Sequence, residues 1–212
     1  MTSSILRVPE GFETPLDYAE SFPSMGGREI GGRLECLAAA VPAGQAIVEV
    51  GSWLGSGTAH LALGANYSGA PIHCFDRWRA NEEEAKKARE FGIPLERGQD
   101  TLPWVEERLE PFGAEIHYHK GRLLDADWRV TPIGLYVDDA SKSPQLWRKA
   151  ARTFLPYVPV GGFLVLMDYF FFEKRGARYK AQYRWMATRQ DQFRLVEDHV
   201  GGTTTAIFER IA

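Results

Sequence analysis

The sequence predicts an α/β fold, a doubly wound and mostly parallel seven-stranded sheet of the Rossmann-like kind that ends in a C-terminal antiparallel hairpin. Three observations predict it. Short apolar runs alternate five times with helical segments, a glycine-rich turn follows the first run, and the last stretch has the pattern of a closing hairpin. Such alternation favours a parallel sheet covered on both faces, with ligands bound at the carboxyl ends of the strands.

The elements follow one another along one domain, residues 30–212, after an N-terminal arm, residues 1–29, that holds one short helix. Apolar, β-branched runs predict parallel strands at residues 46–51, 70–76, 114–121, 133–139 and 161–169. Helical periodicity, with Gly and Pro at the ends, predicts helices at residues 30–40, 58–67, 81–91, 101–113, 143–155 and 176–190. Asn81 and Ser143 are placed to cap two of them. The hairpin is expected over residues 193–210.

Composition excludes several classes of protein. The 212 residues carry a net charge of −3 and a pI near 6.0, without a basic stripe, so no nucleic-acid partner is expected. No segment approaches the ~18 apolar residues of a membrane span, and no targeting signal is present, so we expect a cytoplasmic protein with no membrane partner. Cys36 and Cys74 lack metal-ligand spacing and are expected to be buried free thiols.

The glycine turn after the first strand has the sequence "IVEVGSWLGSGT", Ile47–Thr58. A phosphate-binding P-loop needs a Lys that this turn lacks. A dinucleotide motif needs a second Gly where Trp53 stands, and a pyrophosphate cannot approach past an indole. What remains is the pattern ExGxxxG, although any tight strand-to-helix turn also uses glycine.

Acidic residues follow three of the predicted strands. Asp76 ends the second strand, "YVDDASK" ends the fourth, and "VPVGGFLVLMDYFFF" carries the fifth. With ExGxxxG, this combination resembles the class I S-adenosylmethionine (SAM)-dependent methyltransferases, and among them the small-molecule O-methyltransferases typified by macrocin O-methyltransferase. The resemblance runs from about residue 30 to about residue 193, and the general plan is similar to that of catechol and caffeoyl-CoA O-methyltransferases.

The resemblance implies SAM as the cofactor. Its contacts would fall on Glu49, Gly51, Trp53, Gly55, Gly57, Thr58, Asp76, Gly121, Arg122 and Leu123. Glu49 and the N–H groups of the turn would meet the methionine ammonium and carboxylate, and Thr58 would add a hydroxyl. Asp76 would accept hydrogen bonds from both ribose hydroxyls. The last three residues of the set would lie beside the adenine.

The resemblance also implies a divalent metal, Mg²⁺, on Asp138 and Asp168, with Asp139 or water as a further ligand. Met167 replaces the first acid of the family's "DDY", and Asp139 could equally cap the next helix, so the sequence leaves metal dependence open. A metal would lower the pKa of the substrate hydroxyl. Without it a side-chain base is needed, and the candidates are Lys142 and His199, so the catalytic set is Asp138, Lys142 and His199.

The expected activity is therefore transfer of a methyl group from SAM to a hydroxyl of a small molecule, a sugar or a phenol of natural product biosynthesis. The aromatic run Tyr169–Phe172 is expected to form part of the wall of the acceptor pocket. Two alternatives stay open, a SAM-binding partner protein that has lost catalysis and a nicotinamide-dependent oxidoreductase. The sequence also leaves open whether the chain forms a homodimer.

Overall fold

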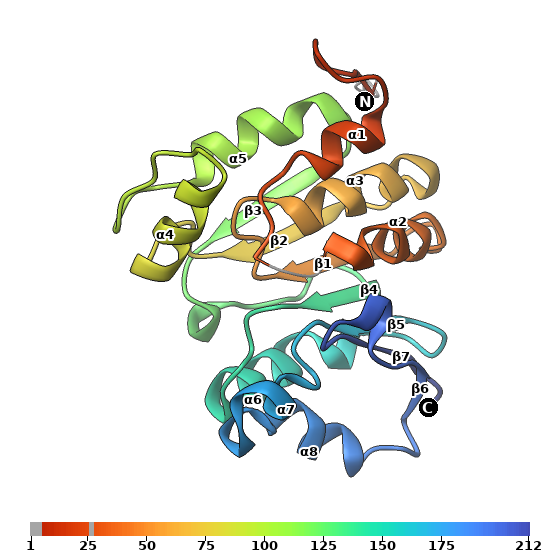
Figure 1. Cartoon of the computed structure of the whole chain (residues 1–212). Coiled ribbons are helices and arrows are strands. Elements are labelled where there is room, and N and C mark those ends of the chain that lie inside the picture. Colours follow the sequence, from red (N-terminus) through yellow and green to blue (C-terminus); the bar gives the residue numbers. More distant parts are fainter. Residues whose placement is uncertain (1–5, 26–27) are drawn as a thin grey trace.

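A seven-stranded sheet with the order β3-β2-β1-β4-β5-β7-β6 forms the centre of the molecule (Figure 1). The structure, a computed structural model, describes residues 6–25 and 28–212. The parallel strands are β1 (Ala46–Val50), β2 (Ile72–Asp76), β3 (Ile116–Lys120), β4 (Ile133–Asp138) and β5 (Phe163–Leu166). The antiparallel hairpin consists of β6 (Phe193–Glu197) and β7 (Ala206–Arg210), and β7 pairs with β5. The predicted doubly wound sheet and its closing hairpin are confirmed.

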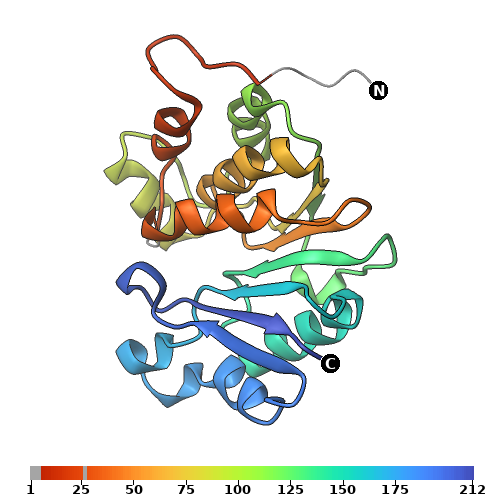
Figure 2. The ribbon, with the colours of Figure 1, turned by 90° about the vertical axis from the view of Figure 1, so that its right-hand side faces the viewer.

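Helices cover both faces of this sheet (Figures 1 and 2). On one face lie α1 (Pro15–Glu20), α2 (Gly31–Ala39), α3 (Ser56–Ser68), α4 (Glu82–Glu90) and α5 (Leu102–Leu109); on the other lie α6 (Pro144–Thr153), α7 (Phe171–Arg175) and α8 (Ala181–Ala187). Short 3₁₀ turns are η1 (Arg28–Ile30), η2 (Glu110–Phe112), η3 (Leu123–Asp125), η4 (Leu155–Tyr157), η5 (Ala177–Tyr179) and η6 (Val200–Gly202). Successive residues of a strand enter opposite cores, as Ile47 and Val48 do, which explains the unbroken apolar runs of the sequence.

The region after β5 differs from the expectation. The strand ends at Leu166, and the aromatic run continues into helix α7. The single helix expected over residues 176–190 is divided into η5 and α8. The break before η5 lies at Gly176, whose backbone (φ 88°, ψ 171°) is a conformation that side-chain-bearing residues rarely adopt.

The predicted helix caps form, and the two cysteines are free. Asn81 makes a reciprocal capping box with Glu84, and the Ser143 hydroxyl accepts a hydrogen bond from the Leu146 N–H. Cys74 is buried as expected, but Cys36 is exposed, which corrects the prediction for that residue. In the part of the chain that the structure describes, every helix is too short or too polar to cross a membrane.

The predicted arm contains the expected short helix, α1, and this helix packs into the main hydrophobic core. Tyr18 and Phe22 are buried beside Phe112, and the Arg108 guanidinium lies 4.7 Å from the centre of the Phe22 ring. The chain then crosses the edge of the sheet at which β1 ends (Figure 1). The arm therefore contributes both to the core and to this edge; residues 1–5 lie outside the described part.

Helices α2 and α3 approach closely because glycines stand where they meet. A Cβ on Gly64 would lie 2.2 Å from the Glu35 carbonyl oxygen, and one on Gly31 would lie 2.5 Å from the His60 ring. This packing holds the first turn of α2 near the end of β1.

We predict that Phe22→Ala lowers the free energy of unfolding by about 3 to 5 kcal/mol, because the ring is fully buried and its loss leaves a cavity. Chemical denaturation measures the change. Leu16→Ala, at an exposed position of helix α1 shortly before Phe22, is the control and should change stability by less than about 0.5 kcal/mol. Equal effects of the two substitutions would show that the arm is not part of the folded core.

Candidate active site

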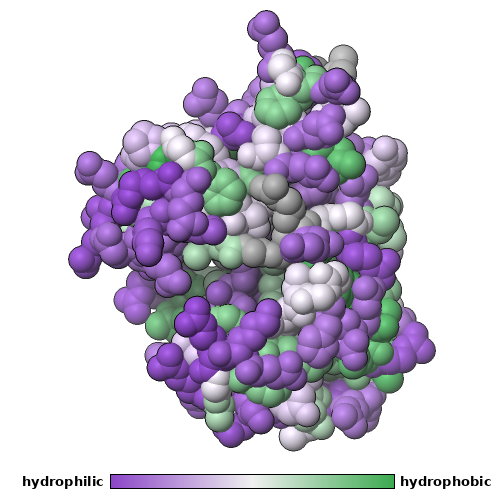
Figure 3. Space-filling model, in the orientation of Figure 1, coloured by the Kyte–Doolittle hydropathy of each residue, from purple (hydrophilic) through white to green (hydrophobic). Residues whose placement is uncertain are grey.

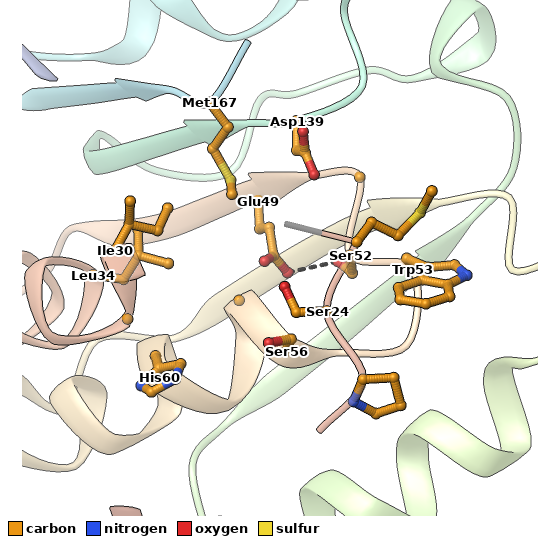
Figure 4. A pocket seen from close by; sticks show the side chains of 15 residues that line it. Ser24, Ile30, Leu34, Glu49, Ser52, Trp53, Ser56, His60, Asp139 and Met167 are labelled. Atoms are coloured by element: carbon orange, nitrogen blue, oxygen red, sulfur yellow. Dashed lines mark hydrogen bonds between the residues drawn. The ribbon is translucent and has the colours of Figure 1, made fainter. Parts of the chain in front are cut away.

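The carboxyl ends of β1, β4 and β5 meet at one edge of the sheet. The Asp139 N–H donates to the Val50 carbonyl at 2.9 Å, and the Met167 N–H donates to the Asp138 carbonyl at 3.0 Å. A pocket of about 490 Å³, including the part open to solvent, lies at this edge (Figure 4). Of the residues predicted from the sequence, it is lined by Glu49, Gly51, Trp53, Gly57 and Asp139.

Glu49 is the buried acid of this pocket, with 3% of its surface exposed. Its Oε2 accepts hydrogen bonds from the Ser52 hydroxyl at 2.6 Å and the Thr58 hydroxyl at 2.5 Å. Its Oε1 faces Gly57, where a Cβ would lie only 2.5 Å away. Burial raises the pKa of Glu49, and the two hydroxyls oppose the shift. Among the described residues no Lys or Arg pairs with Glu49, so a cationic ligand would gain a full charge partner here.

Thr58 lies behind Glu49 and is fully buried, with its hydroxyl engaged by that carboxylate. Any contribution it makes to cofactor binding therefore runs through Glu49. The pair explains why the first turn of α3 carries a hydroxyl at a buried position.

Three residues of the glycine turn, Gly51, Trp53 and Gly55, have a positive φ. Gly51 has φ 96° and a Cβ there would press on Ala140 at 3.0 Å, so this glycine allows close packing of the loop after β4. Gly55 has φ 84° and faces Leu109 of α5 at an ordinary distance, so its backbone conformation at the start of α3 requires glycine there. Trp53, with φ 46°, is the residue of the turn that combines a side chain with a positive φ, and its N–H donates to Asp76 at 3.0 Å.

Asp76 joins the turns after β1 and β2. One carboxylate oxygen accepts from the Trp53 N–H and the other accepts from the Trp78 N–H at 2.7 Å. The Gly121 N–H donates to the Asp76 carbonyl at 2.9 Å, and the space where a Gly121 side chain would stand is open. Arg122 is exposed beside it. Leu123 packs partly against the cluster of buried residues around Trp128. The structure thus brings the predicted ribose and adenine residues together beside the glycine turn.

Asp138, the predicted metal ligand and catalytic residue, is not among the residues that line the pocket. Its carboxylate is fully buried and accepts hydrogen bonds from the Tyr136 hydroxyl at 2.7 Å and from the N–H groups of Ala140 and Ser141 at 3.1 and 2.8 Å. Burial raises its pKa, and these hydrogen bonds oppose the shift. Asp138 holds the loop that presents Asp139.

Lys142 stands between the other two predicted metal ligands. Its Nζ lies 2.9 Å from Asp168 and 3.8 Å from Asp139. Burial works to lower the pKa of Lys142, but the two carboxylates outweigh it and the pKa is raised, so Lys142 is a cation and not a proton acceptor. About a third of the Asp139 side chain is exposed. Desolvation nevertheless raises the pKa of Asp139 well above its usual value. The Lys142 ammonium opposes this shift, and the Asp168 carboxylate adds to it.

The set proposed for Mg²⁺ does not fit a metal ion. In the described residues no three or more His, Cys, Asp or Glu side chains form a group that could hold a metal. Asp138 is committed to its own loop, Asp168 is paired with Lys142, and Met167 offers a thioether where Mg²⁺ prefers oxygen.

His199, the second base candidate, lies outside the pocket. Its ring stacks on Phe170 with centroids 4.0 Å apart, and its Nε2 lies 3.2 Å from Glu173. About half of the side chain is exposed. The structure therefore gives His199 no contact with the pocket residues that would receive an acceptor.

Sequence reasoning missed part of the pocket wall. The missed residues include Ser24, Ile30, Leu34, Ser52, Ser56, His60 and Met167 (Figure 4). Ser52 could have been predicted from the sequence, because a hydroxyl three residues after a buried acid can donate a hydrogen bond to that acid. The residues from the arm and α2 could not be predicted from local sequence, because tertiary packing brings them to this edge. Gly31 packs on His60 of α3, and Tyr18 and Phe22 of the arm pack on Phe112.

Comparison with known proteins identifies the family. A family model described as a methyltransferase domain matches residues 48–169, which is more than half of the chain. The chain therefore belongs to this methyltransferase domain family, and it is a class I SAM-dependent methyltransferase by family and fold. The alternative of a nicotinamide-dependent oxidoreductase is wrong. A search of curated protein sequences gave no match.

Solved structures share the fold at low sequence identity. The O-methyltransferase NovP matches with a TM-score of 0.65 and 11% identity, over 90% of this chain and 83% of its own. A Podospora anserina methyltransferase bound to S-adenosylhomocysteine has a TM-score of 0.60 and 12% identity, over 97% and 89% of the two chains. The N-methyltransferase NodS from Bradyrhizobium japonicum has a TM-score of 0.53 and 14% identity, over 87% and 96%. The fold therefore accommodates methyl transfer to either oxygen or nitrogen.

We predict that Asp138→Asn lowers the free energy of unfolding by about 1 to 3 kcal/mol, because an amide offers one acceptor oxygen where the loop uses two. Denaturation with and without millimolar Mg²⁺ measures it, and the loss should be the same in both. Asp191→Asn, at an exposed position, is the matched control. A loss that appears only when Mg²⁺ is present would restore Asp138 as a metal ligand.

Proposed function

We propose that the protein transfers the methyl group of SAM to a hydroxyl group of a small molecule. The observation that supports it is one pocket with two different acids on its wall. Glu49 is a buried carboxylate without a cationic partner among the described residues, and Asp139 is a partly exposed carboxylate beside an ammonium group. The first suits a zwitterionic cofactor, and the second suits an acceptor that must lose a proton.

The residues of the turn fit the amino-acid end of SAM. Glu49 lines the pocket, and its carboxylate would hold the ammonium group of SAM. The first turn of α3 would offer N–H groups to the carboxylate of SAM. Each oxygen of Asp76 keeps a lone pair beside its backbone donor and would accept a ribose hydroxyl. Gly121, Arg122 and Leu123 would flank the adenine.

SAM supplies an electrophilic methyl group on a sulfonium. The chain must place an acceptor oxygen near it and take the proton from that oxygen. Asp139 would take it, because it lies on the pocket wall and its raised pKa makes it a stronger base than an ordinary aspartate. Lys142 stays protonated and would orient Asp139 and Asp168 as a positioning residue. No step runs through a metal ion, since the residues do not fit one.

We predict that Glu49→Gln weakens SAM binding by about 2 kcal/mol, or roughly 30-fold, through loss of the charge that meets the ammonium. Wild-type affinity should fall as the pH is lowered through the raised pKa of Glu49, because only the ionised carboxylate attracts the ammonium; the variant should lack this dependence. Titration calorimetry across pH measures both. Glu83→Gln, at an exposed position, is the control. A folded Glu49→Gln protein with wild-type affinity would remove Glu49 from the site.

We predict that Asp139→Asn lowers kcat by about 100-fold, the scale of losing a general base, while SAM affinity stays within about twofold. Transfer of labelled methyl from SAM to a panel of hydroxylated small molecules measures turnover, and EDTA should leave it unchanged. Asp127→Asn, a surface acid paired with Arg129, is the control. Turnover that EDTA abolishes and Mg²⁺ restores would overturn this mechanism, and SAM binding without any methyl transfer would favour a partner protein that has lost catalysis.

A further inference from the structure

The segment after β5 has a charge opposite to that of the whole chain. Residues 169–184 contain five Lys or Arg residues and one acid, Glu173, whereas the chain has a net charge of −3. The segment comprises α7, η5 and the first turns of α8. Its one acid, Glu173, lies 3.2 Å from His199 on the neighbouring loop.

Three of these cations, Arg175, Arg178 and Lys180, lie over aromatic rings. Arg178 lies 4.8 Å from the centre of the Tyr179 ring, and Lys180 lies 4.5 Å from that of Phe172. Within residues 6–25 and 28–212, no carboxylate forms an ion pair with Lys174, Arg175, Arg178 or Lys180. The guanidinium groups are therefore held in place by apolar contact while their N–H donors stay available to a ligand.

One ring connects this segment to the pocket. The Lys142 Nζ lies 5.5 Å from the centre of the Phe171 ring, and the Arg175 guanidinium lies 5.9 Å from the same centre. Lys142 in turn pairs with Asp168 at 2.9 Å and lies 3.8 Å from Asp139, which lines the pocket. The cationic segment thus begins where the pocket ends, on the side of Asp139. In Figure 3 this face of the molecule is hollowed, and hydrophilic side chains are dense below the hollow.

We infer that the methyl acceptor carries an anionic group, phosphate or carboxylate, which Arg175 and Arg178 bind while the hydroxyl to be methylated lies at Asp139. This inference rests on the proposed function. A guanidinium offers paired N–H donors that match the oxygens of both anions, and a cation without a carboxylate partner gives up no ion pair when the anion arrives. The half-buried faces of Phe171 and Tyr179 supply apolar contact for the body of the acceptor.

A second group of arginines serves as a matched control. Arg148 and Arg152 of α6 are exposed and line a separate groove with Trp185 and Arg189. Arg189 lies 3.8 Å from the centre of the Trp185 ring, so this groove has the same residue types without a connection to the pocket. Removing two arginines from either place changes the net charge equally.

The test is binding of pyrophosphate and of citrate to the SAM-loaded protein, measured by titration calorimetry for wild type, Arg175→Ala/Arg178→Ala and Arg148→Ala/Arg152→Ala. We expect the first variant to lose affinity by about tenfold or more and the second to match wild type. The ratio of pyrophosphate to citrate affinity identifies the preferred anion. Arg175→Lys/Arg178→Lys keeps the charge without the paired donors and should restore only part of the affinity.

Methyl transfer to matched pairs of compounds, a sugar and its phosphate or a phenol and its carboxylate, gives a second measurement. We expect the anionic member of a pair to be preferred, and the preference to disappear in Arg175→Ala/Arg178→Ala through KM. Three results would each overturn the inference. The wild type and Arg175→Ala/Arg178→Ala could bind the anions equally well, the Arg148→Ala/Arg152→Ala control could lose anion affinity instead, or a single-stranded RNA oligonucleotide could bind more tightly than the anions at Arg175 and Arg178. The same anion titrations are repeated without SAM. Failure of SAM to bind would defeat the proposed function, whereas anion binding without SAM that depends on Arg175 and Arg178 would still place the anion site at these arginines.

Discussion

The buried carboxylate of Glu49 is the constraint around which the cofactor side of the molecule is arranged. A charge in the interior is costly unless it is hydrogen-bonded or paired. Ser52 and Thr58 supply two hydroxyl donors, and both residues are buried for that reason. Gly57 must lack a side chain because a Cβ there would lie 2.5 Å from Glu49 Oε1, too close for the two atoms to coexist without a shift. Helix α3 thus begins with small residues because they must pack around the Glu49 carboxylate. The pKa of Glu49 is raised, so the two hydroxyls compensate the cost of its burial only in part.

A second electrostatic constraint, the repulsion between neighbouring carboxylates, acts at the edge where β4 and β5 end. Three acids reach this edge, and they cannot all be ionised side by side without compensation. The structure separates them. Asp138 turns inward to the Tyr136 hydroxyl and the loop N–H groups, whereas Asp139 and Asp168 share the Lys142 ammonium. The Lys142 ammonium therefore compensates the charge of Asp139 and Asp168 at this edge.

The sequence was sufficient for the sheet because strand and helix periodicities are local, and the alternation leaves few topologies. It also placed Glu49, Gly51 and Asp76 at the carboxyl ends of β1 and β2, while their contacts with SAM stay predictions. The sequence was insufficient where either of two adjacent side chains could point into the pocket. Asp138 and Asp139 are adjacent and chemically identical, and only the positions of Tyr136 and of the loop N–H groups decide which of them faces the pocket. The contribution of the arm was hidden for a related reason, since its place depends on the aromatic contacts of Tyr18 and Phe22 with residues far along the chain.

The two halves of the pocket differ in the sign of the charge that they leave uncompensated. On the side of β1 and β2, Glu49 and Asp76 present carboxylates without a Lys or Arg partner among the described residues. On the side of β5 and α7, cations lie on aromatic rings without carboxylate partners among them. A cationic sulfonium and ammonium are attracted to the first side, and an anionic molecule is attracted to the second and repelled by the first. This difference in charge would direct the cofactor and the acceptor to separate halves of the pocket before either makes a specific contact. The positive charge of the bound cofactor would then face the negative charge of the bound acceptor across the pocket.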